Sequence, residues 1–136
     1  MQHGSTNTTE VGGLAEALKR PAIAIAGEVA LTDGVLLTFD VVVPDATSML
    51  GLKLHARRVR DEDRDAHDLW TCMELIAAAD ETRAFASPEF DEIRDQLGKE
   101  FADDGPSMRI VTSGVAEAET QRRRTRIRGL VRAIGG

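Results

Sequence analysis

Residues Ala22 to Val43 read AIAIAGEVALTDGVLLTFDVVV, and this stretch contains two runs that resemble β-strands. Its first part, Ala22–Leu31, alternates large apolar residues with small ones, and its second part, Val35–Val43, is rich in β-branched residues. Both patterns are typical of β-strands. Thr32-Asp33-Gly34 lies between them and is a glycine-containing connection of the length found in β-hairpins. The sequence therefore predicts a β-hairpin ahead of Pro44.

Helical patterns follow the hairpin. Apolar residues recur every three or four positions, most clearly after Asp65. Three helices are expected, over Thr47–Val59, Asp65–Ala79 and Ser87 to about Ala102. Thr47 or Ser48 is the expected N-cap of the first helix. The charged residues Arg60–Arg64 are expected to be a solvated connection between the first two.

The end of the chain is less well determined by its pattern. Met108–Thr112 fits either a short strand or the start of a last helix, and residues 115–134 follow it. Residues 1–12 are polar, so we expect a disordered N-terminal segment, followed by one domain over residues 13–136. A short helix is expected at Leu14–Arg20, ended by Pro21. The predicted fold class is α+β, with a small N-terminal β-hairpin or sheet packed against a C-terminal helical bundle.

The composition excludes several classes of protein. A net charge of −6 argues against a protein that coats nucleic acid, and 4% aromatic residues argue against a base-stacking surface. Cys72 is the single cysteine, which excludes an intrachain disulfide and a cysteine-based metal site. No apolar run reaches the roughly 18–20 residues of a membrane span, and no secretory signal is evident. We therefore expect a cytoplasmic protein.

Residues Pro44–Ile76 carry a family resemblance. Two spacings, L-x-x-K-x-x-A and R-D-x-x-D-L, fall on the first two expected helices. The matching residues are Leu50, Lys53, Ala56, Arg64, Asp65, Asp68 and Leu69. Residues 12–18, GGLAEAL, also fit a segment that precedes the strand pair. The chain thus resembles the C-terminal part of the AbiEii-type nucleotidyltransferases, toxins of abortive-infection toxin–antitoxin pairs. The resemblance covers about residues 11–80 and implies a nucleotidyltransferase-like C-terminal domain over residues 13–136.

The resemblance implies catalytic and binding roles. Lys53 would be a catalytic residue that also compensates triphosphate charge, because a lysine supplies a mobile positive charge. Asp65 and Asp68 would be catalytic and lean towards one site, since they lie at i, i+3 spacing. Arg64 would bind phosphate. Structural alternatives stand beside these roles: a solvated Lys53, a helix-capping Asp65, and an Arg64 paired with a neighbouring acid.

The metal-binding half of the family's active site has no counterpart in this sequence. The resemblance implies an upstream glycine-serine turn and a D-x-D pair that bind Mg²⁺, whereas the first aspartate here is Asp33. We therefore assign no metal ligands. Magnesium and a nucleoside triphosphate are expected only if the missing half is supplied. The expected function is a nucleotidyltransferase-like protein or fragment that is incomplete as an enzyme.

Several partners are compatible with the sequence. The resemblance implies an antitoxin, or a protein that carries the catalytic half. RNA is a further candidate, through a basic segment near the C-terminus. Its arginines are Arg122, Arg123, Arg124, Arg126 and Arg128. A solvated helix paired with acids is the alternative for this segment. The alternative function for the whole chain is a non-catalytic interaction or regulatory domain, able to form a homo-oligomer, and a protein unrelated to this family stays open as well.

Overall fold

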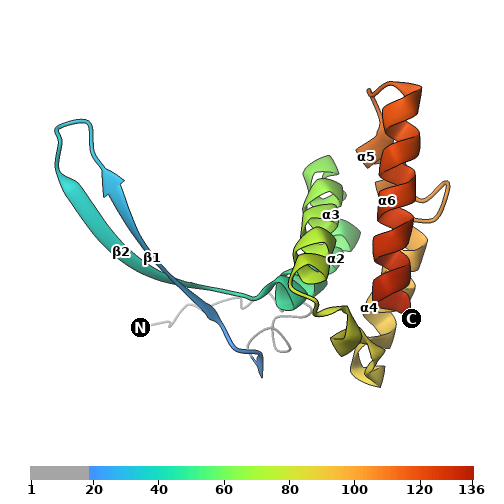
Figure 1. Cartoon of the computed structure of the whole chain (residues 1–136), viewed down its shortest axis with the longest axis horizontal. Helices are drawn as coiled ribbons and strands as arrows, with labels where there is room; N and C mark the ends of the chain where they lie inside the picture. The colour runs from blue at the N-terminus through green and yellow to red at the C-terminus, as the bar shows by residue number, and fades with distance from the viewer. Residues whose placement is uncertain (1–18) are drawn as a thin grey trace, which may run out of the picture.

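The computed structural model describes residues 19–136, which form a β-hairpin followed by a group of helices (Figure 1). The α+β class predicted from the sequence is confirmed. The elements are β1 (Ile23–Ala30), β2 (Leu36–Val43), α2 (Ala46–Arg60), α3 (Asp63–Ala78), the 3-10 turns η1 (Thr82–Ala86) and η2 (Pro88–Phe90), α4 (Asp91–Glu100), α5 (Pro106–Thr112) and α6 (Glu117–Gly135). The predicted segment 1–12 and almost all of the predicted helix Leu14–Arg20 lie outside the described residues.

The hairpin forms at the predicted positions. β1 and β2 pair antiparallel, from Ile23 opposite Val43 to Ala30 opposite Leu36. In the turn, Gly34 has a φ of 85°, a left-handed conformation that glycine adopts without steric cost. The Asp33 carboxylate accepts a hydrogen bond from the backbone N–H of Val35 at 3.0 Å. These features explain why Thr32-Asp33-Gly34 reverses the chain.

The hairpin projects away from the helices and meets them at its base (Figure 1). Arg20 anchors this base, because its Nε donates to Asp45 Oδ2 at 2.8 Å. Asp45 Oδ1 in turn accepts from the backbone N–H of Ser48 at 2.8 Å and so caps α2. The predicted packing of the sheet against the bundle is thus confined to the base of the hairpin.

The cap of α2 differs from the prediction. Asp45 is the N-cap, so the expectation of Thr47 or Ser48 is wrong. Both of these residues lie inside the first turn and are buried. An aspartate is as good an N-cap as a serine, and here it also binds Arg20. The pattern of apolar residues gave no sign of that second bond.

The connection between the first two helices is also shorter than expected. Only Asp61 and Glu62 lie between α2 and α3, and Asp61 has a left-handed φ of 50°. The predicted connection Arg60–Arg64 was therefore too long, because Arg60 belongs to the last turn of α2 and Arg64 to the first turn of α3. The tight turn brings α2 and α3 together as an antiparallel pair.

The later helices begin and end at specific signals. Ser87 does not begin an α-helix directly, because η2 precedes α4. Met108–Thr112 lies in a separate helix, α5, which has Pro106 in its first turn; the strand alternative is wrong. Gly105 makes the preceding bend possible, since a Cβ there would lie 2.4 Å from the Glu100 carbonyl oxygen.

The hydrophobic core lies among the helices. It is mostly aliphatic, as the low aromatic content predicts, although Phe85 is completely buried. Large buried residues that build it include Leu50 and Leu54 of α2, Leu69, Met73 and Ile76 of α3, Leu97 of α4, Met108 and Val111 of α5, and Ile127, Leu130 and Ile134 of α6. No large apolar residue of β1 or β2 belongs to this core. Within residues 19–136, no helix is long and apolar enough to cross a membrane.

Two leucines of α3 test where the core lies. We expect Leu69→Ala to lower the free energy of unfolding by about 2–5 kcal/mol, because Leu69 is fully buried and its truncation leaves a cavity. Leu75→Ala is the matched control on the same helix, and it should cost less than about 1 kcal/mol because Leu75 is 55% exposed. Urea denaturation followed by circular dichroism measures both. Equal losses would contradict this description of the core.

Candidate functional site

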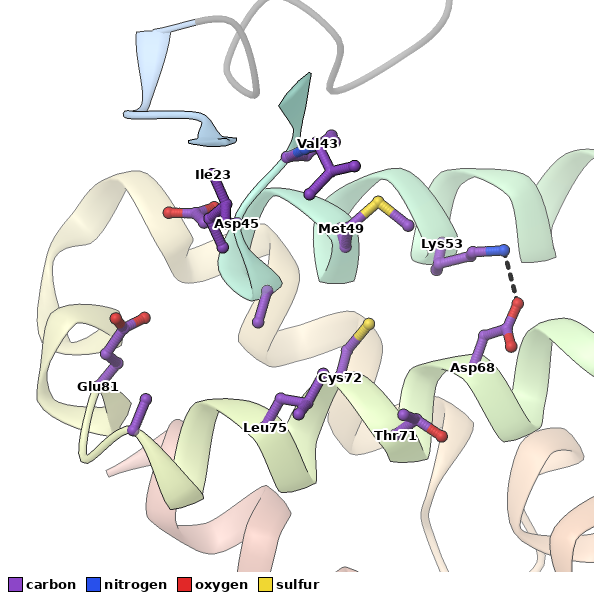
Figure 2. Close-up of a pocket in the computed structure, with 13 residues that line it drawn as sticks. Ile23, Val43, Asp45, Met49, Lys53, Asp68, Thr71, Cys72, Leu75 and Glu81 are labelled. Carbon is purple, nitrogen blue, oxygen red and sulfur yellow. Dashed lines mark hydrogen bonds and ion pairs between the residues drawn. The ribbon is translucent and has the colours of Figure 1, made fainter. Parts of the chain in front are cut away.

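Three residues singled out by the sequence meet between α2 and α3. Lys53 and Asp68 can be followed in Figure 2. Lys53 of α2 places its Nζ 2.5 Å from Asp68 Oδ2 and 3.7 Å from Asp65 Oδ1, both on α3. The i, i+3 spacing of the two aspartates therefore does turn both carboxylates towards one lysine. Their grouping agrees with the expectation from the resemblance, while their catalytic roles stay predictions.

Asp65 is the most constrained member of this cluster. Its side chain is fully buried, and it accepts two hydrogen bonds of 2.8 Å from Arg60 Nε and Nη2. The bidentate hydrogen bond with Arg60 holds the pKa of Asp65 below its ordinary value, against the opposing effect of burial. Asp65 does not act as the helix cap, because Glu62 holds the N-cap position of α3. Its role in the structure is to bind α2 to α3.

The charges of the cluster balance. Lys53 and Arg60 carry two positive charges, and Asp65 and Asp68 carry two negative ones. A phosphate would have to compete with these carboxylates for Lys53, at the energetic cost of leaving a buried charge with fewer partners. The cluster as it stands is better suited to joining two helices than to holding a polyphosphate.

Arg64 lies apart from this cluster. Its Nε is 3.0 Å from Glu62 Oε2, and its side chain is 69% exposed. This is the arrangement given above as the alternative to phosphate binding. Arg60, which makes the bidentate contact with Asp65, is not among the residues that the sequence singled out. The available signal was a basic residue at the end of one helix and an acid early in the next, across a two-residue turn.

A groove opens beside the cluster, at the base of the hairpin (Figure 2). It has a volume of about 570 Å³, and Lys53 and Asp68 lie on its wall. The rest of the wall is mainly apolar. The apolar lining comprises Ile23, Val43, Pro44, Ala46, Met49, Cys72, Leu75 and Ala79. The groove therefore joins the hairpin to the helix pair through a mainly apolar surface.

The groove has neither a reactive thiol nor a cluster of metal-binding side chains among the described residues. Burial raises the pKa of the Cys72 thiol to about 11, so the thiol is neutral near pH 7 and behaves as a small apolar side chain. Among residues 19–136, no three His, Cys, Asp or Glu side chains lie close enough to hold a metal ion. Asp61 in the turn pairs instead with Arg57, and Asp65 of α3 pairs with Arg60.

The two faces of the hairpin differ in chemistry. Since side chains alternate along a strand and the register pairs odd positions with odd ones, the odd-numbered residues share one face. This apolar face consists of Ile23, Ile25, Gly27, Val29, Leu31, Val35, Leu37, Phe39, Val41 and Val43. The opposite face carries Glu28, Thr38 and Asp40 as well as apolar residues. The apolar face runs into the groove, because its last pair, Ile23 and Val43, lines it.

The apolar face is largely open to solvent. Eight large side chains on it, from Ile23 to Val41 inclusive, are each 40–50% exposed. They leave on the order of 700 Å² of apolar surface, more than the ~300–600 Å² of the largest patch on a typical monomer. The alternating pattern predicted the strands but not this exposure, because alternation alone does not say whether a helix covers the face.

The five arginines assigned to RNA all have partners within the chain. Arg126 forms an ion pair of 2.6 Å with Glu74 and holds the pKa of that carboxyl below its ordinary value. The remaining four bond as follows: Arg122 and Arg123 to the Glu119 carboxylate, Arg124 to the Asp103 backbone oxygen, and Arg128 to the Asp103 carboxylate. These bonds agree with the solvated-helix alternative, and RNA binding stays a prediction.

Comparison with known proteins yields no relative. No protein-family model matches the chain, and neither a curated protein nor a solved structure does. The resemblance to the AbiEii-type nucleotidyltransferases is accordingly an expectation from a few residues, and the geometry of the chain itself is the basis for a functional proposal.

Acid sensitivity tests the role of Asp65. Since folding lowers the pKa of this carboxyl, its stabilisation is present above pH ~4 and is lost as the pH falls through the lower folded pKa. We expect Asp65→Asn to cost about 2 kcal/mol at neutral pH and to flatten the fall in stability below pH ~4. Asp68→Asn is the control and should cost less than about 1 kcal/mol, because its side chain is 42% exposed. Urea denaturation, repeated from about pH 7 down to about pH 3, measures the free energy of unfolding and its dependence on pH. If the free energy of unfolding of Asp65→Asn falls with pH in parallel with that of the wild type, the assignment is refuted.

Proposed function

We propose that the chain is a non-catalytic interaction domain, and that the apolar face of its hairpin is the surface that docks a protein partner. The observation that carries this proposal is the set of eight large, half-exposed apolar side chains along one face of a sheet that no helix among residues 19–136 covers. Exposed apolar patches of this size mark interaction sites in folded proteins.

The stability of the hairpin supports the same proposal. A two-stranded sheet is marginally stable in water by itself, and its apolar face gains stability when another surface packs on it. The base is fixed by the contact between Arg20 and Asp45, so the hairpin leaves the bundle in a defined direction. A projecting, anchored sheet with one apolar face is suited to reaching a second molecule.

The charged cluster supports a structural role in such a domain. Asp65 is buried and bound to Arg60, and Lys53 is bound to Asp68. These bonds hold α2 against α3 beneath the hairpin base, where Ile23, Val43 and Met49 line the groove. The cluster therefore stabilises the platform from which the hairpin projects.

Photo-crosslinking in the source cells tests the docking surface. A photoreactive residue at Leu37, on the apolar face, should give an adduct of discrete mass with one identified protein, because a docked partner covers that side chain. Leu36 is the matched control, since it is the same residue type on the same strand and points to the opposite face. It should give little or none of that adduct. No discrete adduct at Leu37, or equal yields at both positions, would contradict the proposal.

A second candidate function rests on the placement of Lys53. If the resemblance to nucleotidyltransferases reflects ancestry, a lysine and an aspartate on the wall of a 570 Å³ groove mark where a nucleotide would bind once a metal-binding half is supplied. The balanced charges around Lys53 weigh against binding by the chain alone.

Calorimetry separates this candidate from the first. Under the interaction-domain proposal, titration of a nucleoside triphosphate with Mg²⁺ should give no heat of binding that depends on Lys53. Under the nucleotidyltransferase candidate, the wild type should bind and Lys53→Ala should bind at least about tenfold more weakly. Lys99→Ala is the control, because Lys99 is an exposed lysine of α4 with its own partner, Asp95. A loss of binding confined to Lys53→Ala would favour the nucleotide site.

A further inference from the structure

We infer that the partner on the apolar face is a second copy of this chain, packed hairpin against hairpin about a two-fold axis. This inference rests on the proposed function, since it names the partner of the same docking surface. Two-fold dimers are the commonest symmetric assemblies, and they require a surface that is complementary to itself.

The area available fits a dimer. Each copy offers on the order of 700 Å² of apolar surface from the eight exposed side chains, which is close to the ~800 Å² per partner of a specific interface. The groove adds Met49 and Leu75 at the base of the same surface. Interfaces of about this size have dissociation constants from micromolar downwards.

The charges of the hairpin favour an identical face as the partner. The whole hairpin carries three acids and no base: Glu28 and Asp40 on the opposite face and Asp33 in the turn. The apolar face carries no charge at all. Two copies can therefore pack apolar face to apolar face without bringing acid against acid, and the acids of both copies stay in water.

The middle of the apolar face has a shape that suits close packing. The outer edge of the Phe39 ring lies against Gly27 on the neighbouring strand, so closely that a Cβ at Gly27 would lie 2.5 Å from Phe39 Cζ. The ring fills the space that a side chain at position 27 would occupy. The face is thereby continuous across both strands, with β-branched residues and leucines on either side of the ring.

Other packings leave the apolar face exposed. Pairing of two hairpins through their strand edges would extend the sheet but would keep both apolar faces in water. A basic partner would be attracted to Glu28 and Asp40 on the opposite face, and salt would weaken that attraction. These packings predict different sensitivities to substitution and to salt, so one experiment distinguishes them.

Sedimentation equilibrium of the full chain, from low to high micromolar concentration, is the test. We expect a reversible dimer that persists in about 1 M sodium chloride, where charge interactions are screened within about 3 Å. Leu37→Asp should raise the dimer dissociation constant at least about a hundredfold, because a two-fold interface contains the substitution twice. Leu36→Asp, the same change on the opposite face, should leave the constant within about threefold of the wild type. Circular dichroism and the urea midpoint of both variants verify that the bundle stays folded.

The outcomes separate this inference from the docking proposal. A chain that stays monomeric at high micromolar concentration overturns the second copy as partner, and so does a dimer weakened by Leu36→Asp or by salt. If the chain is monomeric while the Leu37 photo-adduct in cells contains a different protein, the docking surface stands and the second-copy inference falls. A monomeric chain with no discrete adduct refutes both.

Discussion

The buried carboxylate of Asp65 is the constraint on which the rest of the bundle depends. A charge without access to water is tolerated only when other groups compensate for it, and here Arg60 and Lys53 do so from the neighbouring helix. The two-residue turn between α2 and α3 places these groups in reach of one another. The packed helix pair then provides the surface on which α5 and α6 close the core. It also fixes the first turn of α2, from which the hairpin departs.

The same compensation shapes the functional conclusion. A lysine beside two aspartates in a groove resembles the beginning of a catalytic site, yet Lys53 already has its counter-charges. The large apolar side chains that remain exposed to water lie elsewhere, along the odd-numbered residues of the hairpin. Their side chains are half exposed, whereas the buried leucines of the helices are covered almost completely. The need for a partner is therefore greatest at the sheet.

The sequence was sufficient to predict most strands and helices. It was insufficient to predict the contacts between residues that are far apart along the chain. Alternation and a glycine-containing turn located both strands, and apolar periodicity located α2 and α3, because these signals act over a few neighbouring residues. The cap at Asp45 and the contact of Arg60 with Asp65 depend on residues brought together by the fold, so local patterns did not reveal them. Spacing predicted only that Asp65 and Asp68 lean towards one side of their helix. The resemblance implied their grouping with Lys53, and neither signal revealed the charge balance of the cluster. The openness of the hairpin face was equally hidden, since alternation looks the same in a covered sheet and in an exposed one.

Because the hairpin meets the bundle only near Asp45, substitutions in one part have little effect on the packing of the other. Substitutions on the hairpin face leave the bundle core unchanged, because no large residue of that face belongs to the core. Selection can thus alter which molecule the hairpin recognises while the bundle keeps its stability. Gly27 and Phe39 are coupled within the hairpin, since a side chain at position 27 would displace the Phe39 ring or need a smaller residue at position 39. Among related chains, these two positions should vary as a pair, while their neighbours on the strands drift independently.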